Sequence, residues 1–130
     1  MTLAARFLGG AKSRLLPASI PFRYFTAAVC FHVLAWLALL AAADELPGFI
    51  GGPGNVLAAI HLLTLGVLVM TAMGAAFQLL PVATRHPLAQ TWPARLSFWL
   101  LTPGIFMLTY GMAIGHETAM IVGGIGVAVS

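Results

Sequence analysis

Apolar residues fill long runs of this chain, and short polar stretches separate them. The first run covers Tyr24–Ala43, the second Val56–Val82 and the third Leu96–Gly115. A helix of about 20 apolar residues crosses the hydrocarbon core of a bilayer, so each run is long enough to span a membrane. A fourth run, Thr118–Ser130, would give only ~20 Å of helix, which is too short to cross.

These runs predict an all-α, polytopic transmembrane helical bundle with three full spans and a partial or truncated fourth. We expect a basic N-terminal segment at residues 1–23 and one transmembrane domain at 24–130, with helices at about 24–43, 56–82, 96–115 and 118–130. We also expect the natural chain to continue past Ser130; the alternative is a partial terminal helix. Composition agrees, because only 7% of residues are charged, against about a quarter in soluble domains. The mean hydropathy is +1.01.

The charges divide between the two sides of the predicted membrane. The basic residues precede the first run or lie between the second and third, whereas the acidic residues lie at the opposite ends of the runs. The basic set is Arg6, Lys12, Arg14, Arg23, Arg85 and Arg95, and the acidic set is Asp44, Glu45 and Glu117. The positive-inside rule then predicts a cytoplasmic N-terminus in a bacterial inner membrane. Topology and contact with the lipid bilayer explain the net positive charge, so we expect no nucleic-acid partner.

The second run carries four polar side chains, His61, Thr64, Thr71 and Gln78. On an α-helix, at about 100° per residue, they share about 100° of the surface. Unpaired polar groups are costly in lipid, so we predict that this side faces other helices or a cofactor. Hydrogen bonding to neighbouring helices is the alternative role for the two threonines.

Histidine has the widest chemical use among these side chains, because neutral imidazole binds metals. His61 lies ~9 Å and His32 ~16 Å from the predicted outer membrane surface by helical rise. Both are candidate metal ligands, with a hydrogen-bonded core histidine as the alternative for His32. His116 is expected to be an interfacial residue and His86 a solvated loop residue. The single cysteine, Cys30, has no partner for an internal disulfide and is expected to be a buried, inert thiol.

The segments "HLLTLG" (61–66) and "GAAFQLLPV" (74–82) resemble the second transmembrane helix of haem–copper oxidase subunit I and its relatives, which include cytochrome oxidases and nitric oxide reductases. The run "PFRYFTAAVCFHVLAWLAL" (21–39) extends the likeness to bacterial relatives. The resemblance implies that His61 ligates a low-spin haem, of b type, near the outer face. The family's second axial histidine and its copper ligands lie on later helices that have no counterpart here, so copper is not supported.

The first functional hypothesis is therefore a haem-binding membrane subunit for electron transfer or respiratory-type reduction, an oxidoreductase relative that is not catalytic alone. Its cofactor-binding residues would be His61, His32, Thr64 and Thr71, with the two histidines as metal ligands. Other membrane subunits, a second copy or His32 would complete the haem site. The second hypothesis is a non-catalytic structural or assembly subunit of a larger membrane complex. A third is a chlorophyll-type pigment binder, based on the spacing of Ala28 and His32.

Overall fold

The computed structural model describes residues 15–130. The basic residues Arg6, Lys12 and Arg14, and most of the predicted segment 1–23, lie outside the described residues. The elements in chain order are α2 (Ser19–Ala41), the short 3₁₀ turn η1 (Leu46–Gly48), α3 (Asn55–His61), the π-helical segment η2 (Leu62–Val69), α4 (Met70–Ala83), α5 (Trp92–Ile114) and α6 (Glu117–Ala128).

Three helices are long and apolar enough to cross a membrane, which confirms the predicted fold class. They are Ser19–Ala41, the continuous helix Asn55–Ala83 formed by α3, η2 and α4, and Trp92–Ile114. The shorter α6 follows as the predicted fourth helix. The part of the chain that the structure describes contains no strand. The chain therefore has the architecture of a membrane protein.

Two helices begin earlier than the apolar runs because proline is tolerated in a first helical turn, where its missing N–H has no intrahelical partner. Pro21 lies in the first turn of α2, and Pro93 lies in the first turn of α5. α5 ends at Gly115, whose φ of 70° is the left-handed conformation that commonly terminates helices. The second span begins at Asn55, and Gly54 occupies its N-cap position.

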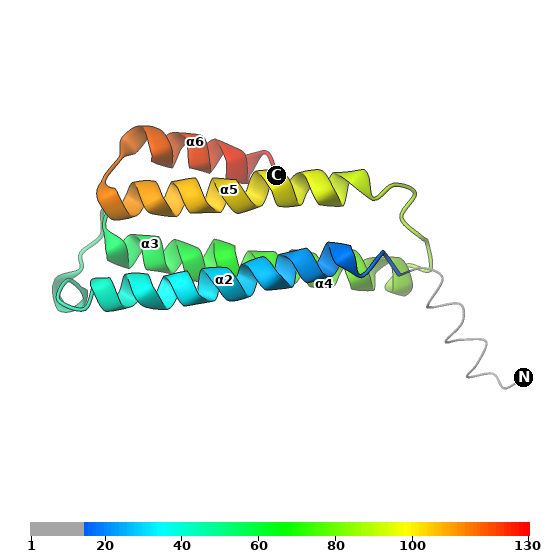
Figure 1. Ribbon diagram of the computed structural model, residues 1–130, viewed down its shortest axis with the longest axis horizontal. Helices are drawn as coiled ribbons and strands as arrows, with labels where there is room; N and C mark the ends of the chain where they lie inside the picture. Colours follow the sequence, from blue (N-terminus) through cyan, green and yellow to red (C-terminus); the bar gives the residue numbers. More distant parts are fainter. Residues whose placement is uncertain (1–14) are drawn as a thin grey trace, which may run out of the picture.

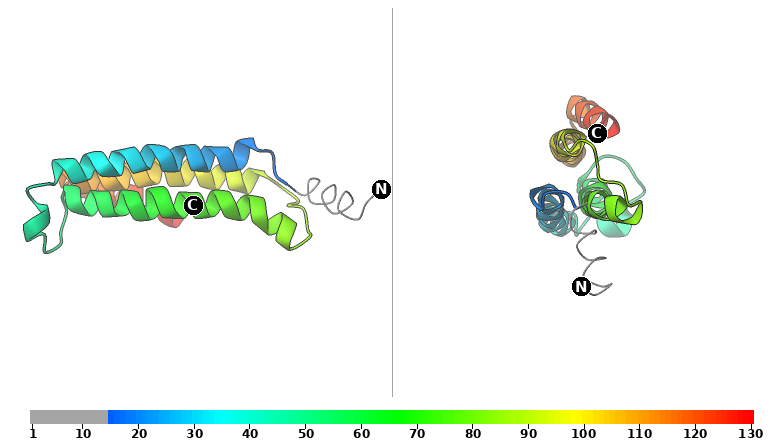
Figure 2. Two further views of the ribbon diagram at one scale, coloured as in Figure 1. Left: turned by 90° about the horizontal axis from the view of Figure 1, so that it is seen from below. Right: turned by 90° about the vertical axis from the view of Figure 1, so that its right-hand side faces the viewer.

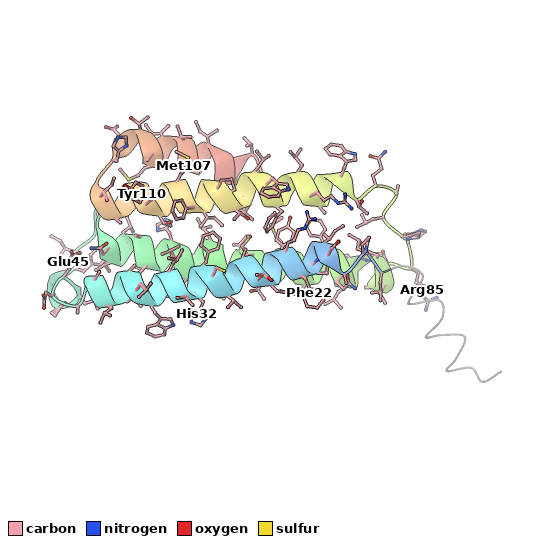
Figure 3. The ribbon with its side chains drawn as sticks, viewed as in Figure 1. Phe22, His32, Glu45, Arg85, Met107 and Tyr110 are labelled. Atoms are coloured by element: carbon pink, nitrogen blue, oxygen red, sulfur yellow. The ribbon has the colours of Figure 1, made fainter. Side chains whose placement is uncertain are left out.

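The helices form a layered bundle (Figures 1 and 2). α2 and α5 run in the same direction, and the second span runs antiparallel beside α2. α6 packs against α5 on the side away from α2 and α4, as the end-on view of Figure 2 shows. Glu45 and Arg85 lie at opposite ends of the bundle (Figure 3), and we call these the acidic end and the basic end.

Close helix contact depends on small residues at defined points. A Cβ atom on Gly66 would lie 2.6 Å from Cβ of Phe31, and one on Gly74 would lie 2.9 Å from Cβ of Tyr24. Both glycines therefore let the second span approach α2 closely. Tyr24 is fully buried, and its hydroxyl donates a 2.7 Å hydrogen bond to the carbonyl oxygen of Ala94, which joins α2 to α5.

The second span changes its winding immediately after His61. The backbone is π-helical over the eight residues Leu62–Val69 and returns to α-helix at Met70. A π turn holds more residues than an α turn, since its hydrogen bonds join residues i and i+5. Each residue in η2 therefore turns the chain by less than 100°. As a consequence, side chains after η2 face directions that a uniform α-helix would not give.

Candidate cofactor site around His61

His61 is the last residue of α3 and borders the π-helical segment. Its side chain is half-buried, and its Nδ1 lies 3.0 Å from the carbonyl oxygen of Leu57, one turn earlier. A carbonyl oxygen can only accept, so Nδ1 carries the proton in this hydrogen bond. The other ring nitrogen, Nε2, then keeps its lone pair. This arrangement is the one that metal-ligating histidines usually have, with one nitrogen fixed by a backbone carbonyl and the other available.

His32 lies on a different surface of the molecule. The side chain is exposed on α2, and its ring stacks on Trp36 with a centroid separation of 6.1 Å. Figure 3 shows it on the side of α2 that faces away from α5. Because His32 points outward from the bundle, the interior does not bring it together with His61. Its assignment as a second ligand stays a prediction, and any metal or haem that it binds would have to lie outside the bundle.

The two threonines are exposed on the bundle surface. Thr64 donates hydrogen bonds to its own helix, at 2.9 Å to the carbonyl oxygen of Ile60 and 3.5 Å to that of His61. The predicted packing of this polar side against other helices is therefore not seen for Thr64 and Thr71 within residues 15–130. The physical reason is the π-helical segment, which rotates residues after His61 out of the α-helical phase. Whether these threonines contact a cofactor stays a prediction.

Gln78 differs from the threonines, since its Oε1 atom is buried and has no hydrogen-bond partner among the described residues. The positions of Ala28 and His32 bear on the alternative of chlorophyll-type pigment binding, which stays a prediction. Ala28 is buried in the core with 4% exposure, whereas His32 is exposed. The pair does not form the open face against which a macrocycle could lie beside its ligand.

Two further sequence expectations have clear structural outcomes. His116 is exposed near the acidic end, and its Nδ1 accepts a 3.2 Å hydrogen bond from the backbone N–H of Ala119, so it caps α6. The sequence did not indicate this capping role, because histidine is not among the residues that usually occupy an N-cap position. Cys30 is exposed, so the prediction of a buried thiol is wrong. An apolar run contains both lipid-facing and helix-facing residues, and its composition does not separate them.

The described residues bring together no group of three or more histidine, cysteine, aspartate or glutamate side chains that could hold a metal ion. His61 therefore belongs to no such group within residues 15–130. No protein-family model, curated protein or solved structure matches this chain.

Proposed function

We propose that this chain is a haem-binding membrane subunit in which His61 would hold the iron and a residue from another polypeptide would supply a second ligand. The carrying observation is the 3.0 Å hydrogen bond from Nδ1 of His61 to the Leu57 carbonyl, which leaves Nε2 free to bind a metal. The π-helical segment adjoins this residue, and such irregular turns occur frequently at functional sites. The resemblance of 61–66 and 74–82 to the haem-binding helix of haem–copper oxidase subunit I adds independent support.

Haem suits a lone histidine better than a free metal ion does. Structural zinc sites, for example, take four protein ligands, whereas a haem iron is commonly held by one or two side chains. Among residues 15–130, His61 belongs to no group of three or more histidine, cysteine, aspartate or glutamate side chains that could hold a metal ion. The donor set thus fits haem, with the second ligand from a second copy or another membrane subunit.

Bound haem would supply one-electron exchange, so the proposed role is electron transfer or respiratory-type reduction within a larger assembly. His61 would hold the iron, and the Leu57 carbonyl would fix the imidazole tautomer and orientation. The proposed location is a bacterial inner membrane with the basic end in the cytoplasm, which puts His61 in the outer half of the bilayer.

The test is the absorption spectrum of the purified protein, oxidised and reduced. We expect a Soret band whose low-spin features disappear in His61→Ala and remain in the matched variants His32→Ala and His116→Ala. A pigment-free wild-type protein, purified from cells with sufficient haem, would contradict the proposal. Retention of the spectrum in His61→Ala would show that another residue ligates the haem.

A non-catalytic assembly subunit is the second candidate, and the exposed apolar surface favours it. Large side chains such as Phe22, Trp36 and Trp99 are each more than 60% exposed in the described structure. Lipid can cover such surface, and so can a partner. For an assembly subunit, a larger membrane partner would co-purify without pigment, and His61→Ala would change its recovery alone.

A further inference from the structure

A groove of about 900 Å³ lies between α2 and α5. Both helices point the same way, so their N-terminal portions lie at the basic end (Figure 1). Apolar and aromatic side chains make most of its surface. Its α2 wall comprises Ser19, Phe22, Arg23, Thr26, Ala27, Cys30, Phe31 and Leu34, and its α5 wall comprises Phe98, Trp99, Thr102, Pro103 and Phe106.

No helix of the described chain closes this groove from outside. Phe22 is 65% exposed, Trp99 64% and Phe106 53%. α6 covers a different side of α5. The groove is therefore open to whatever surrounds the bundle, over the length of both aromatic walls.

One charged side chain, Arg23, lines the groove, and it lies near its basic end. The three acidic residues of the sequence are Asp44, Glu45 and Glu117. All three belong to the acidic end of the bundle, so no carboxylate side chain of this chain is near Arg23. Arg95 lies one helical turn before Trp99 and adds a second exposed cation toward the same end. An anion at this end would therefore meet positive charge without competition from the protein's own acids.

The length of the groove matches one leaflet. Arg23 and Leu34 are separated by ~16 Å of helical rise, and half of the hydrocarbon core is ~15 Å thick. A hydrocarbon chain is narrow enough to follow the aromatic walls from the surface toward the middle of the bilayer.

We propose that this groove binds an anionic phospholipid, with its phosphate at Arg23 and an acyl chain between α2 and α5. Positive charge at one end and an apolar channel beyond it correspond to the two parts of such a lipid. Arg23 selects the anionic headgroup, and the aromatic walls hold the chain. This site is separate from His61 and does not depend on haem binding.

Tryptophan quenching by brominated lipids tests the proposal without a bulky label. A variant with Trp36→Phe and Trp92→Phe keeps Trp99 in the groove. A matched variant with Trp92→Phe and Trp99→Phe keeps Trp36 on the opposite surface of α2, where its 61% exposure is similar. Each protein is placed in phosphatidylcholine vesicles that contain brominated phosphatidylglycerol or brominated phosphatidylcholine at equal mole fraction.

We expect brominated phosphatidylglycerol to associate with Trp99 about fivefold more strongly than brominated phosphatidylcholine. The same ratio at Trp36 should be close to one. Arg23→Gln should reduce the Trp99 ratio to the Trp36 value, whereas Arg85→Gln, which changes a cation outside the groove at the same end, should leave it unchanged.

Three results would overturn the proposal. The first is equal ratios at Trp99 and Trp36, and the second is a Trp99 ratio that Arg23→Gln leaves unchanged. The third is protection of Trp99 from both brominated lipids while Trp36 is quenched, which would mean that a protein surface covers the groove.

Discussion

The two sides of α5 differ sharply in how they meet their neighbours. Toward α6, glycine removes the side chains from the contact, and a Cβ on Gly123 would lie 2.2 Å from the backbone nitrogen of Leu108. Toward α2, the aromatic walls around Trp99 leave an open groove of about 900 Å³. Apolar surface alone does not drive helices together in lipid, because lipid tails are equally apolar. Close backbone approach is what distinguishes the closed contact from the open one.

Gly123→Val, which alters the closed contact between α5 and α6, should have the largest effect on stability. The new side chain would collide with the α5 backbone at Leu108, which cannot rotate away as a side chain can. We expect a loss of at least about 3 kcal/mol in the free energy of unfolding, measured by SDS titration in mild detergent. Gly124→Ala in the same helix is the control, since nothing lies within 4 Å of its Cβ. Equal stabilities for the two variants would show that the α5–α6 contact is not tight.

Gly66→Ala should have the next largest effect and tests the contact between α2 and the second span. Its Cβ would meet the Cβ and ring of Phe31. The helices must then separate, or the ring of Phe31 must move. Phe31 also lines the groove, so either change would alter the groove as well. We expect a destabilisation of about 1–3 kcal/mol in the same titration. A loss below that of Gly124→Ala would contradict the close approach of these helices.

Tyr24→Phe should cost about 1 kcal/mol, because it leaves the Ala94 carbonyl without the 2.7 Å hydrogen bond that joins α2 and α5. This bond is a point where the two helices that bound the groove are held together. The control is Tyr110→Phe, which changes an exposed tyrosine on α5. Thermal unfolding in detergent gives the comparison, and an unchanged midpoint for Tyr24→Phe would argue that the bond contributes nothing net.

Thr102→Val should have the smallest effect, and with the opposite sign. The hydroxyl oxygen of Thr102 is buried without a partner among the described residues, so its removal relieves an unmet hydrogen bond. We expect stabilisation of up to about 1 kcal/mol. Thr109→Val is the matched control on α5, because that hydroxyl donates a 2.8 Å bond to the Ile105 carbonyl and its loss should destabilise. Destabilisation by Thr102→Val would indicate a partner, such as a bound molecule.

The sequence predicted the helices well because length and apolarity alone determine which segments can span a bilayer. It did not show which side of each helix is buried. Cys30 and Phe31 are neighbours in one apolar run, yet one is exposed and the other is buried in the core. In a membrane protein both environments favour apolar side chains, so hydropathy carries little information about the direction a residue faces.

The candidate site was only partly predictable for a related reason. His61 stood out because an ionisable side chain inside a span is uncommon, and its hydrogen bond to Leu57 follows from helical spacing. The directions in which Thr71 and Gln78 face, relative to His61, were not predictable, since no residue between them indicates that the backbone is π-helical. The groove could not be predicted from the sequence, because there Arg23 served only as one of the basic residues that indicate the orientation of the chain in the membrane. The alignment of Arg23 with Trp99 depends on how two separate spans pack.

The π-helical segment also gives the second span a tolerance to changes in chain length. Its hydrogen-bonded rings contain one residue more than α-helical rings. Removing a residue within Leu62–Val69 would let this stretch tighten toward α-helix while α3 and α4 kept their own packed faces. A uniform α-helix has no such reserve, because a deletion would rotate everything beyond it by about 100°. The part of the span next to His61 is thus where a deletion would disturb the bundle least.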